Sequence, residues 1–584
     1  MYEIPTNEGA TKVTVPRDTA SKARFHITRL FPFLRWPRPT AQTLRRDVWA
    51  GISVGLVLVP QALAYATLAG MPPHTGLYAA LLPALVGMLW GSSTLLAVGP
   101  VALTSILVFG SLSSMAPPGS PHWVALAIWL SLYSGAIQFL LGVFRMGKIA
   151  CLVSQPVVTG FINAAAVIII ASQLPQLLGV SLSLQDWAAS HRLVEISPAT
   201  GLTATFGCTA LALLLALKRL APRVPSILIV TVLGILTSRW LGYAGLGGAV
   251  VGTLPAGLPS LGMPPLIPFD AHRELWLGAL ILAVVSFTEA MSSCRVLARK
   301  QNERWDENQE LIGQGLAKIT SGLAGAFPVS GSFSRSALNL YAGAVSAWSS
   351  LVATLCVLLS LLFLTDFIAD LPYSVLAAMI MLPVFNLLDL GAFKRLMRIS
   401  RDDTAVALVT FIVTLSFAPR LHVGVFAGVG LTMASFLYRR THPRIVEVSQ
   451  HNDGTLRDRS RFGLPPLASD LLAVRMDSAL NFLTAATLER FISERIQQGS
   501  GTKRVLLVCS GINDIDASGV EALESMHKSL RGDGVNFYFS NVKKQVYEVL
   551  EKSGVIAIIG SERLFATDRQ AVDGLAAQPA GRFR

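Results

Sequence analysis

Charged residues are scarce in this chain. Only 14% of its 584 residues are Asp, Glu, Lys or Arg, whereas roughly 25% is usual in soluble domains. Hydrophobic residues make up 52% of the chain, and its mean hydropathy is +0.54. The composition therefore excludes an ordinary soluble globular protein and predicts a polytopic membrane protein.

Cysteine is also scarce, and the motifs of several enzyme classes are missing. The five cysteines include no CxxC pair and lie mostly in or beside apolar runs, so neither a disulfide framework nor a zinc site is expected. The absence of a Walker A phosphate loop excludes an ATP-driven pump. "SGSFS" superficially suggests a serine nucleophile, but His74, His122 and His422 fall at the ends of predicted spans, away from membrane depth. We predict no enzymatic activity, no cofactor and no metal site.

Basic residues outnumber acidic ones, which gives a formal net charge of +13. They gather in the first 46 residues and in short connections, without the interleaved aromatic residues of a nucleic-acid surface, so nucleic acid is not a predicted partner. Residues 1–46 lack the apolar core of a signal peptide, and "RFHITRLFPFLRW" within them is typical of an interfacial amphipathic helix. We interpret 1–46 as a basic cytoplasmic N-terminal segment.

Apolar runs that could cross a bilayer recur from residue 48 to residue 438 and form two groups of seven. The first group is 48–68, 75–90, 99–113, 122–143, 156–178, 201–218 and 223–240, and the second is 274–298, 309–326, 331–345, 347–365, 372–389, 403–418 and 421–438. Connections expected inside carry several Lys or Arg each, whereas "AGMPPHTG", "SLSSMAPPGSPH" and "LTDFIADLP", expected outside, carry none. An even count with this alternation predicts a multi-pass cell membrane protein with both termini cytoplasmic, in a bacterial inner membrane.

The third span of each group is short and interrupted by Gly, Pro or Ser: "VGPVALTSILVFG" and "VSGSFSRSALNLYAG". Gly99 and Pro100 delay the first helix until about Val101. In the same way "FPVSG" delays the second until Ser332 or Phe333. Such spans at corresponding places in two halves indicate an inverted-repeat transporter with a midplane site. Because the two spans run in opposite directions, their helix N-termini meet and favour an anion.

Polar side chains near these breaks are candidates for anion contacts. An arginine at membrane depth costs roughly 3 kcal/mol on insertion scales, so Arg335 is predicted to be functional. Ser332 and Ser334 offer hydroxyls to a bound oxyanion, and Thr104 and Ser105 offer them from the first half-helix. Close helix packing is the alternative explanation for these four small residues.

Two further spans carry isolated polar groups. In the first span Gln61 and Tyr65 share one helical face and are expected to flank the cavity, with a purely structural role as the alternative. In the eighth span Glu289 lies within an apolar run. One polar face is predicted around it: Ser286, Ser292 and Ser293. A lone carboxylate at this depth takes up a proton, meets a cation or pairs with an arginine, and the first two roles suit coupling.

Beyond Arg440 the composition becomes that of a soluble domain. "LLAVRM", "RVLLVCSGI" and "NFYFSNV" are typical of short buried strands, and three segments between and after them have helical periodicity. Strands alternating with helices predict a small α/β domain at 468–570. A linker at 441–467 is expected before it and a disordered tail at 571–584 after it.

The motifs "VPQALAYATLAGMPPHTGLYA", "VGPVALTS" and "FPVSGSFSRSALN" resemble those of the sulfate permease (SulP) family of anion transporters, and "INDIDASGVEAL" resembles the family's C-terminal STAS domain. The resemblance implies an α-helical polytopic protein with a seven-plus-seven inverted repeat and commonly a homodimer. It divides the transport domain, 47–440, into a core that moves against a gate. The core is 47–145 and 272–365, and the gate is 146–271 and 366–440.

The resemblance also implies roles for single residues. It places the anion site on Val101, Ala102, Phe333, Ser334 and Arg335, with Gln61 and Tyr65 as cavity residues. Glu289 matches the position linked to proton coupling in several members, and a sodium arrangement is not evident, which favours H+ over Na+. Ser518 lies where anti-sigma antagonists carry a phosphorylatable serine, although an N-terminal helix cap is the favoured interpretation.

The predicted function is secondary active transport of a small oxyanion, namely proton-coupled sulfate uptake by an elevator-like motion. A bicarbonate or C4-dicarboxylate carrier of the same fold is one alternative. A membrane sensor that signals to a cytoplasmic protein partner through its STAS domain is another.

Overall fold

A computed structural model describes most of the chain: residues 31–36, 39–148, 154–180, 198–221, 224–255, 257–385, 387–418, 420–498 and 501–576. The chain folds as two compact units, Met1–Thr432 and Met433–Arg584. The first unit is mostly helical and contains thirteen of the fourteen predicted spans and the first part of the last one, 421–438. The second contains the predicted α/β domain.

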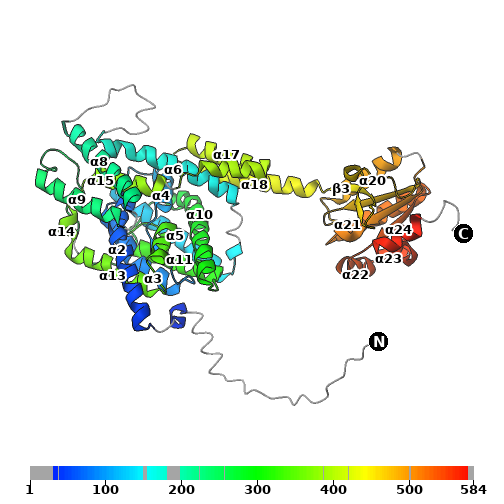
Figure 1. Ribbon diagram of the computed structural model, residues 1–584, viewed down its shortest axis with the longest axis horizontal. Helices are drawn as coiled ribbons and strands as arrows, with labels where there is room; N and C mark the ends of the chain where they lie inside the picture. The colour runs from blue at the N-terminus through cyan, green and yellow to red at the C-terminus, as the bar shows by residue number, and fades with distance from the viewer. Residues whose placement is uncertain are drawn as a thin grey trace, which may run out of the picture. The chain divides into compact units, whose positions relative to one another are not determined.

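Each of the fourteen predicted spans contains a helix (Figure 1). The first seven are α2 (Ala41–Leu68), α3 (His74–Trp90), α4 (Ala102–Leu112), α5 (Pro121–Val143), α6 (Gln155–Leu178), α8 (Pro198–Leu220) and α9 (Ser226–Leu241). The second seven are α10 (Phe269–Gln301), α11 (Glu307–Leu323), α12 (Phe333–Tyr341), α13 (Trp348–Phe363), α15 (Tyr373–Phe385), α17 (Arg401–Ser416) and α18 (His422–Thr441). Six helical segments of the described residues are long and apolar enough to cross a bilayer: Ala41–Leu68, Pro121–Val143, Gln155–Leu178, Thr200–Leu220, Phe269–Gln301 and Tyr373–Ile399.

The helices pack in two groups. In one group α11 packs on α5 and α3, and α13 packs on α2 and α3. Small residues allow the closest of these approaches, since a Cβ on Gly135 of α5 would lie 2.8 Å from the carbonyl oxygen of Gly315 of α11. In the other group α17 packs on α6, and α15 packs on α6 and α8. The two groups meet where α2 contacts α15 and α9 and where α4 contacts α6.

Two short strands precede the two half-helices. β1 (Ala97–Gly99) and β2 (Ser330–Ser332) pair antiparallel, with Ala97 opposite Ser332 and Gly99 opposite Ser330. The sequence analysis placed a break at each of these positions but predicted no strand. Because the pair is antiparallel, the two broken segments approach each other from opposite directions, as the inverted-repeat interpretation requires.

Some short elements of the first unit were not predicted. They are η1 (Pro32–Arg35), α14 (Thr365–Ile368) and α16 (Leu390–Ile399). The amphipathic helix expected over residues 24–36 is not found in its described part, where only the four-residue η1 occurs, with Phe31 and Phe33 against Trp90. The rest of that prediction lies outside the described residues.

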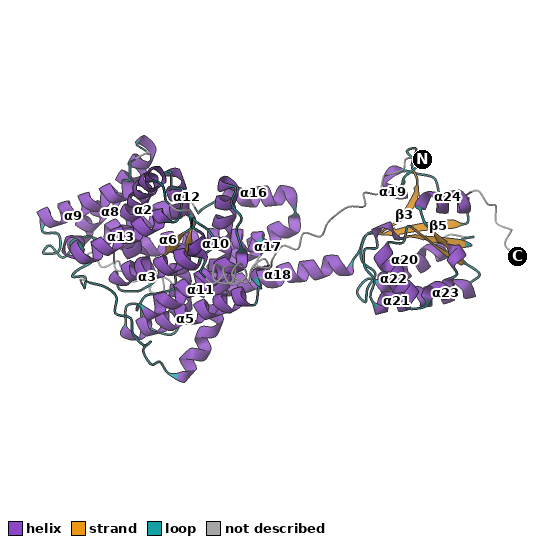
Figure 2. Cartoon of the chain, turned by 90° about the horizontal axis from the view of Figure 1, so that it is seen from below, coloured by secondary structure: helices purple, strands orange, loops and turns teal. Residues whose placement is uncertain are grey.

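The second unit is built on one six-stranded sheet in the order β4-β3-β5-β6-β7-β8. Three predicted strands are present as β5 (Leu471–Met476), β6 (Arg504–Val508) and β7 (Asn536–Ser540), which pair in parallel. The predicted helices are α20 (Ala485–Gln498), α21 (Ala517–Gly532) and α22 (Lys544–Lys552). They cover one face of the sheet together with α23 (Val555–Ile559), and α24 (Asp568–Ala576) packs on the other (Figure 2).

The boundaries predicted for this unit were too narrow. The expected linker at 441–467 contains β3 (Ile445–Gln450), β4 (Leu456–Asp458) and α19 (Arg459–Phe462), and β3 pairs with β5. The expected tail at 571–584 begins inside α24, and a further strand, β8 (Leu564–Phe565), was missed. Most of these elements escaped prediction because they are short.

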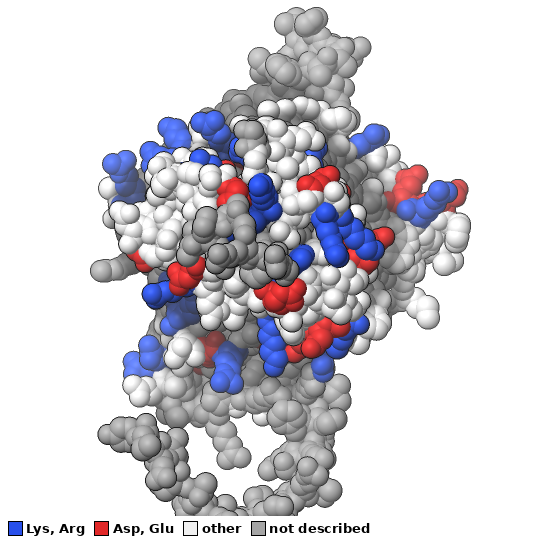
Figure 3. Space-filling view, turned by 90° about the vertical axis from the view of Figure 1, so that its right-hand side faces the viewer, with Lys and Arg blue, Asp and Glu red and all other residues white. Residues whose placement is uncertain are grey.

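Charged side chains of the second unit form local pairs rather than a patch of one sign. Lys and Arg are interspersed with Asp and Glu on the face shown in Figure 3. Arg504 is 8% exposed and binds Asp470 through two nitrogens, at 2.9 and 2.5 Å. The guanidinium holds the pKa of the Asp470 carboxyl below its usual value.

Candidate functional site

The strand pair brings the starts of two half-helices together. Gly99 ends β1 with a φ of +155°, a conformation that favours glycine, and α4 begins three residues later. Val101 is the N-cap of α4 and its side chain makes no capping hydrogen bond, so backbone N–H groups of the first turn have no intrahelical acceptor. At α12 the Ser332 hydroxyl accepts a long hydrogen bond of 3.4 Å from the Arg335 N–H. Both helices begin where the sequence predicted.

Arg335 is the charged group at this junction. Its side chain is 1% exposed, and its Nη1 donates to the carbonyl oxygen of Pro100 at 2.8 Å. Its Nε and Nη2 have no hydrogen-bond partner among the described residues. A second link joins the halves, since the Ala97 N–H donates to the Ser336 hydroxyl at 2.9 Å. Unpaired buried donors on a cation are costly, so this geometry leaves two of them for a ligand that accepts hydrogen bonds.

A cavity of about 190 Å³ reaches Arg335. Gln61 of α2 and Ser334 and Arg335 of α12 line it on the side of the first helix group, and Lys218 of α8 and Leu382 of α15 line it on the side of the second. One water needs roughly 10–15 Å³ of such volume, so a small oxyanion with some water fits. The cavity therefore joins the junction of the half-helices to the boundary between the two helix groups.

The other predicted site residues differ in their surroundings. The hydroxyls of Thr104 and Ser105 are buried and have no hydrogen-bond partner among the described residues. The same is true of the Oε1 atom of Gln61. Ser334 lines the cavity, whereas the Phe333 side chain is 52% exposed. Three residues are buried without lining that cavity: Tyr65, Val101 and Ala102.

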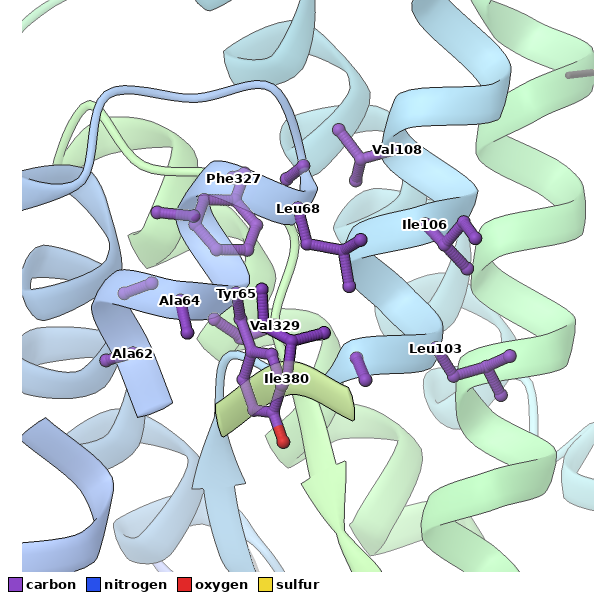
Figure 4. Packing of buried hydrophobic residues seen from close by; sticks show 14 of the residues in the cluster. Ala62, Ala64, Tyr65, Leu68, Leu103, Ile106, Val108, Phe327, Val329 and Ile380 are labelled. Atoms are coloured by element: carbon purple, nitrogen blue, oxygen red, sulfur yellow. The ribbon is translucent and has the colours of Figure 1, made fainter. Parts of the chain in front are cut away.

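Tyr65 packs in the apolar core rather than in the open cavity. Its ring belongs to the same buried cluster as Val329 and Ile380, and Figure 4 shows it beside them. It also interacts electrostatically with Arg335 and Glu289. Tyr65 thus lies near these charged groups without lining the cavity, and its role at the site stays a prediction.

Glu289 lies on α10 and faces the boundary between the helix groups. With Leu103 of α4 and Phe161 of α6 it lines a small apolar hollow. Its Oε2 is buried without a hydrogen-bond partner among the described residues, and the carboxylate interacts electrostatically with Arg335 and with Lys318. The predicted serine face is only partly correct: Ser286 and Ser293 are buried, whereas Ser292 is exposed.

Lys318 of α11 was missed by the sequence analysis. It is fully buried, and its Nζ donates to Gln138 Oε1 of α5 at 2.8 Å and to Ser286 Oγ of α10 at 2.9 Å. The Ser286 carbonyl oxygen accepts from the Ser330 hydroxyl of β2 at 3.0 Å. Lys318 is therefore connected to the strand pair through a single residue. A lysine inside the predicted span 309–326 was the available signal.

Two buried carboxylates hold the segments that flank the junction, and both were missed. Glu310 accepts from the N–H groups of Ser92 and Ser93 at 2.9 and 3.0 Å, just before β1. Asp47 accepts from the N–H groups of Val345 and Ser346 at 2.7 and 3.1 Å, just after α12. They fix the ends of the broken segments and lie away from the cavity.

Comparison with known proteins agrees with this geometry. The model of the sulfate permease family matches residues 44–410, and that of the STAS domain matches residues 466–571. The chain belongs to the sulfate permease family. Its transport region is thus an anion transporter domain, and its α/β unit is a STAS domain.

Relatives and solved structures cover nearly the whole chain. Probable sulfate transporter 4.2 of Arabidopsis thaliana is 32% identical, and the match covers 94% of this chain and 83% of the relative. A probable sulfate transporter of Mycobacterium tuberculosis is 31% identical, and the match covers 91% of this chain and 95% of the relative. The mouse solute carrier 26 family member A9 anion transporter, solved in the inward-facing state, has a TM-score of 0.85 at 22% identity and covers 99% of this chain and 100% of its own. The last likeness shows the helical membrane-transporter fold of this permease.

Ser518 of the STAS domain does not cap its helix. The N-cap of α21 is Asp516, whose Oδ1 accepts from the Gly519 N–H at 2.8 Å. Ser518 is exposed in the first turn of α21. The favoured interpretation of Ser518 as a cap was therefore wrong, because the carboxylate two residues earlier takes that place.

Proposed function

We propose that this permease imports sulfate, or a similar small oxyanion, together with protons. The observation that carries the proposal is Arg335, a buried cation with two unused donors beside a cavity and at the meeting point of two helix N-termini. The relatives named as sulfate transporters support sulfate as the substrate. No chemical step on the anion is part of the proposal.

The proposed coupling group is Glu289. Its carboxylate interacts electrostatically with Arg335 but carries no hydrogen bond to it, so the two groups respond to each other's charge while each keeps a free polar atom. An anion bound at Arg335 weakens the attraction that keeps Glu289 ionised and favours its protonation. Proton and anion would then bind together, as symport requires.

The proposed motion is an elevator in which the core carries the anion past the gate. The boundary between the helix groups passes through the cavity, with Arg335 and Gln61 on one side and Lys218 and Leu382 on the other. Lys218 belongs to a connection that its charge assigns to the cytoplasm, so we expect this cavity to open to the inside.

Further features of the proposal concern its surroundings. We place the permease in a bacterial inner membrane with both termini in the cytoplasm, on the basis of the loop charges. The family resemblance supports a homodimer. The exposed Ser518 is a candidate for phosphorylation that would alter binding of a cytoplasmic protein to the STAS domain.

Uptake by proteoliposomes tests the proposal. Radiolabelled sulfate, bicarbonate, fumarate and succinate are compared with and without an inward proton gradient, using protein whose fold is verified by its thermal transition. We expect saturable sulfate uptake that the gradient accelerates. Uptake of none of these anions would overturn the proposed function, and selective uptake of bicarbonate or a dicarboxylate would overturn sulfate as the substrate.

A further inference from the structure

The buried charges around the junction are more numerous than an anion site built on Arg335 requires. Among the described residues near the strand pair, the charged groups that interact electrostatically are Arg335, Lys318 and Glu289, and the Tyr65 hydroxyl interacts with Arg335 and Glu289. Lys318 is 0% exposed and lies within α11. A fully buried ammonium is expensive unless charge or hydrogen bonding compensates it, so its presence needs a reason.

The immediate partners of Lys318 do not neutralise it. Gln138 and Ser286 accept its hydrogen bonds at 2.8 and 2.9 Å, and both are uncharged. Glu289 lies three residues after Ser286, on the same side of α10, and is the carboxylate with which Lys318 interacts electrostatically. Glu289 is therefore the carboxylate that interacts with both cations, Arg335 and Lys318.

The charge count of the three groups fits a divalent anion. With all three ionised they carry one net positive charge, and protonation of Glu289 raises it to two. Sulfate carries two negative charges, so sulfate and one proton together leave the buried site neutral. Without Lys318 the same occupancy would leave a net negative charge in a low-dielectric region, which is unfavourable.

We propose that Lys318 is the second cation of the transport site and selects divalent over monovalent oxyanions. It acts without touching the anion: its ammonium is held by Gln138 and Ser286, and Ser286 is bonded to Ser330 of β2 at 3.0 Å. The inference rests on the proposed function, since it assumes that an oxyanion binds beside Arg335.

The test compares two tetrahedral anions that differ in charge, sulfate and perchlorate. Binding of radiolabelled sulfate to the purified full-length permease is measured at pH 8, and perchlorate is titrated as a competitor. The variants are Lys318→Met, Glu289→Gln and the double variant, and Lys394→Met on the exposed face of α16 is the matched control. Methionine keeps the length of the lysine stem and removes its charge.

We expect Lys318→Met to lower the preference for sulfate over perchlorate by about tenfold, the effect of one unit charge roughly 10 Å away at an effective dielectric constant of about 20. Glu289→Gln is expected to raise the preference. Because sulfate binds with Glu289 protonated, the sulfate-bound double variant has one positive charge fewer than the unaltered permease and should keep the lowered preference of Lys318→Met. Lys394→Met should leave it unchanged.

Other results separate the two claims. If Lys318→Met weakens the binding of sulfate and of perchlorate by the same factor, or changes the binding of neither, the selective role of Lys318 is overturned. The anion site at Arg335 is not affected by either result. A double variant that regains the preference of the unaltered permease would also overturn the selective role of Lys318, because the site would then not need the charge of Lys318 to hold sulfate. Failure of the unaltered permease to bind sulfate overturns the proposed function itself.

Discussion

The two halves of the membrane unit bring different chemistry to the same place. Near the strand pair the first half supplies uncharged polar groups, namely Gln61, Thr104, Ser105 and Gln138, and the open backbone N–H groups of α4. The second half supplies Glu289, Lys318 and Arg335, and the first half adds one charged residue to the cavity wall, Lys218. The first half therefore contributes mainly uncharged polar groups to the site, and the second half contributes most of the charge.

The largest effect is expected from the charge of the second half-helix. Arg335→Ala should weaken sulfate binding by roughly a hundredfold, because a hydrogen bond to a charged group is worth about 1.5–3 kcal/mol and the guanidinium has two donors to offer. Equilibrium binding of radiolabelled sulfate measures it. Arg299→Ala, exposed in the last turn of α10, is the control. Unchanged affinity in Arg335→Ala would remove this residue from the site.

The next effect concerns the carboxylate of the same half. Glu289→Gln should abolish the acceleration of sulfate uptake by an inward proton gradient while uptake without the gradient persists, because the amide cannot take up the coupled proton. The measurement compares initial rates of sulfate uptake by proteoliposomes when the external pH equals the internal pH and when the external pH is lower. Acceleration that survives the substitution would assign coupling to another group.

A moderate effect is expected where the first half approaches the charge. A Cβ on Gly99 would lie 3.3 Å from Arg335 Nη2, and the φ of +155° is unfavourable for alanine. Gly99→Ala should lower sulfate affinity by about tenfold, as strain of 1–3 kcal/mol implies. Gly430→Ala on α18, where a Cβ meets nothing within 4 Å, should be neutral. If Gly99→Ala and Gly430→Ala had the same sulfate affinity, the strand pair would not determine the geometry of the anion site.

The smallest effect is expected from the uncharged donors. Thr104→Val removes a buried hydroxyl that has no partner among the described residues and keeps the side-chain shape. If the hydroxyl binds the anion, affinity should fall about threefold, within the 0.5–1.5 kcal/mol of a neutral hydrogen bond. Thr237→Val, whose hydroxyl bonds within α9, serves as control. A tighter complex would indicate that Thr104 serves packing alone.

The sequence predicted the helices well because hydropathy marks each span and Gly and Pro mark the breaks. It could not predict the pairing of β1 with β2, since three-residue strands carry no periodic pattern and their partners lie more than two hundred residues apart. α16 was missed because it is short and amphipathic and follows an apolar span directly.

The site was predicted where a single residue is unusual in its own span, as with Arg335 and Glu289. Lys318 shows the limit of that approach. Its span is otherwise mixed with small and polar residues, and its importance appears only when Gln138 of α5 and Ser286 of α10 meet it in space. Ser518 shows the opposite error, since a plausible cap by sequence proved to lie two residues after the actual one.

The most direct test of the central claim is to locate a bound anion. Selenate is a heavier analogue of sulfate, and its anomalous signal marks its position in a crystal of the full-length permease. We predict a single tetrahedral peak within hydrogen-bonding distance, about 3 Å, of Arg335 Nη2 and of the first N–H groups of α4. A peak elsewhere in the membrane unit, with none at Arg335 under saturating selenate, would contradict the account.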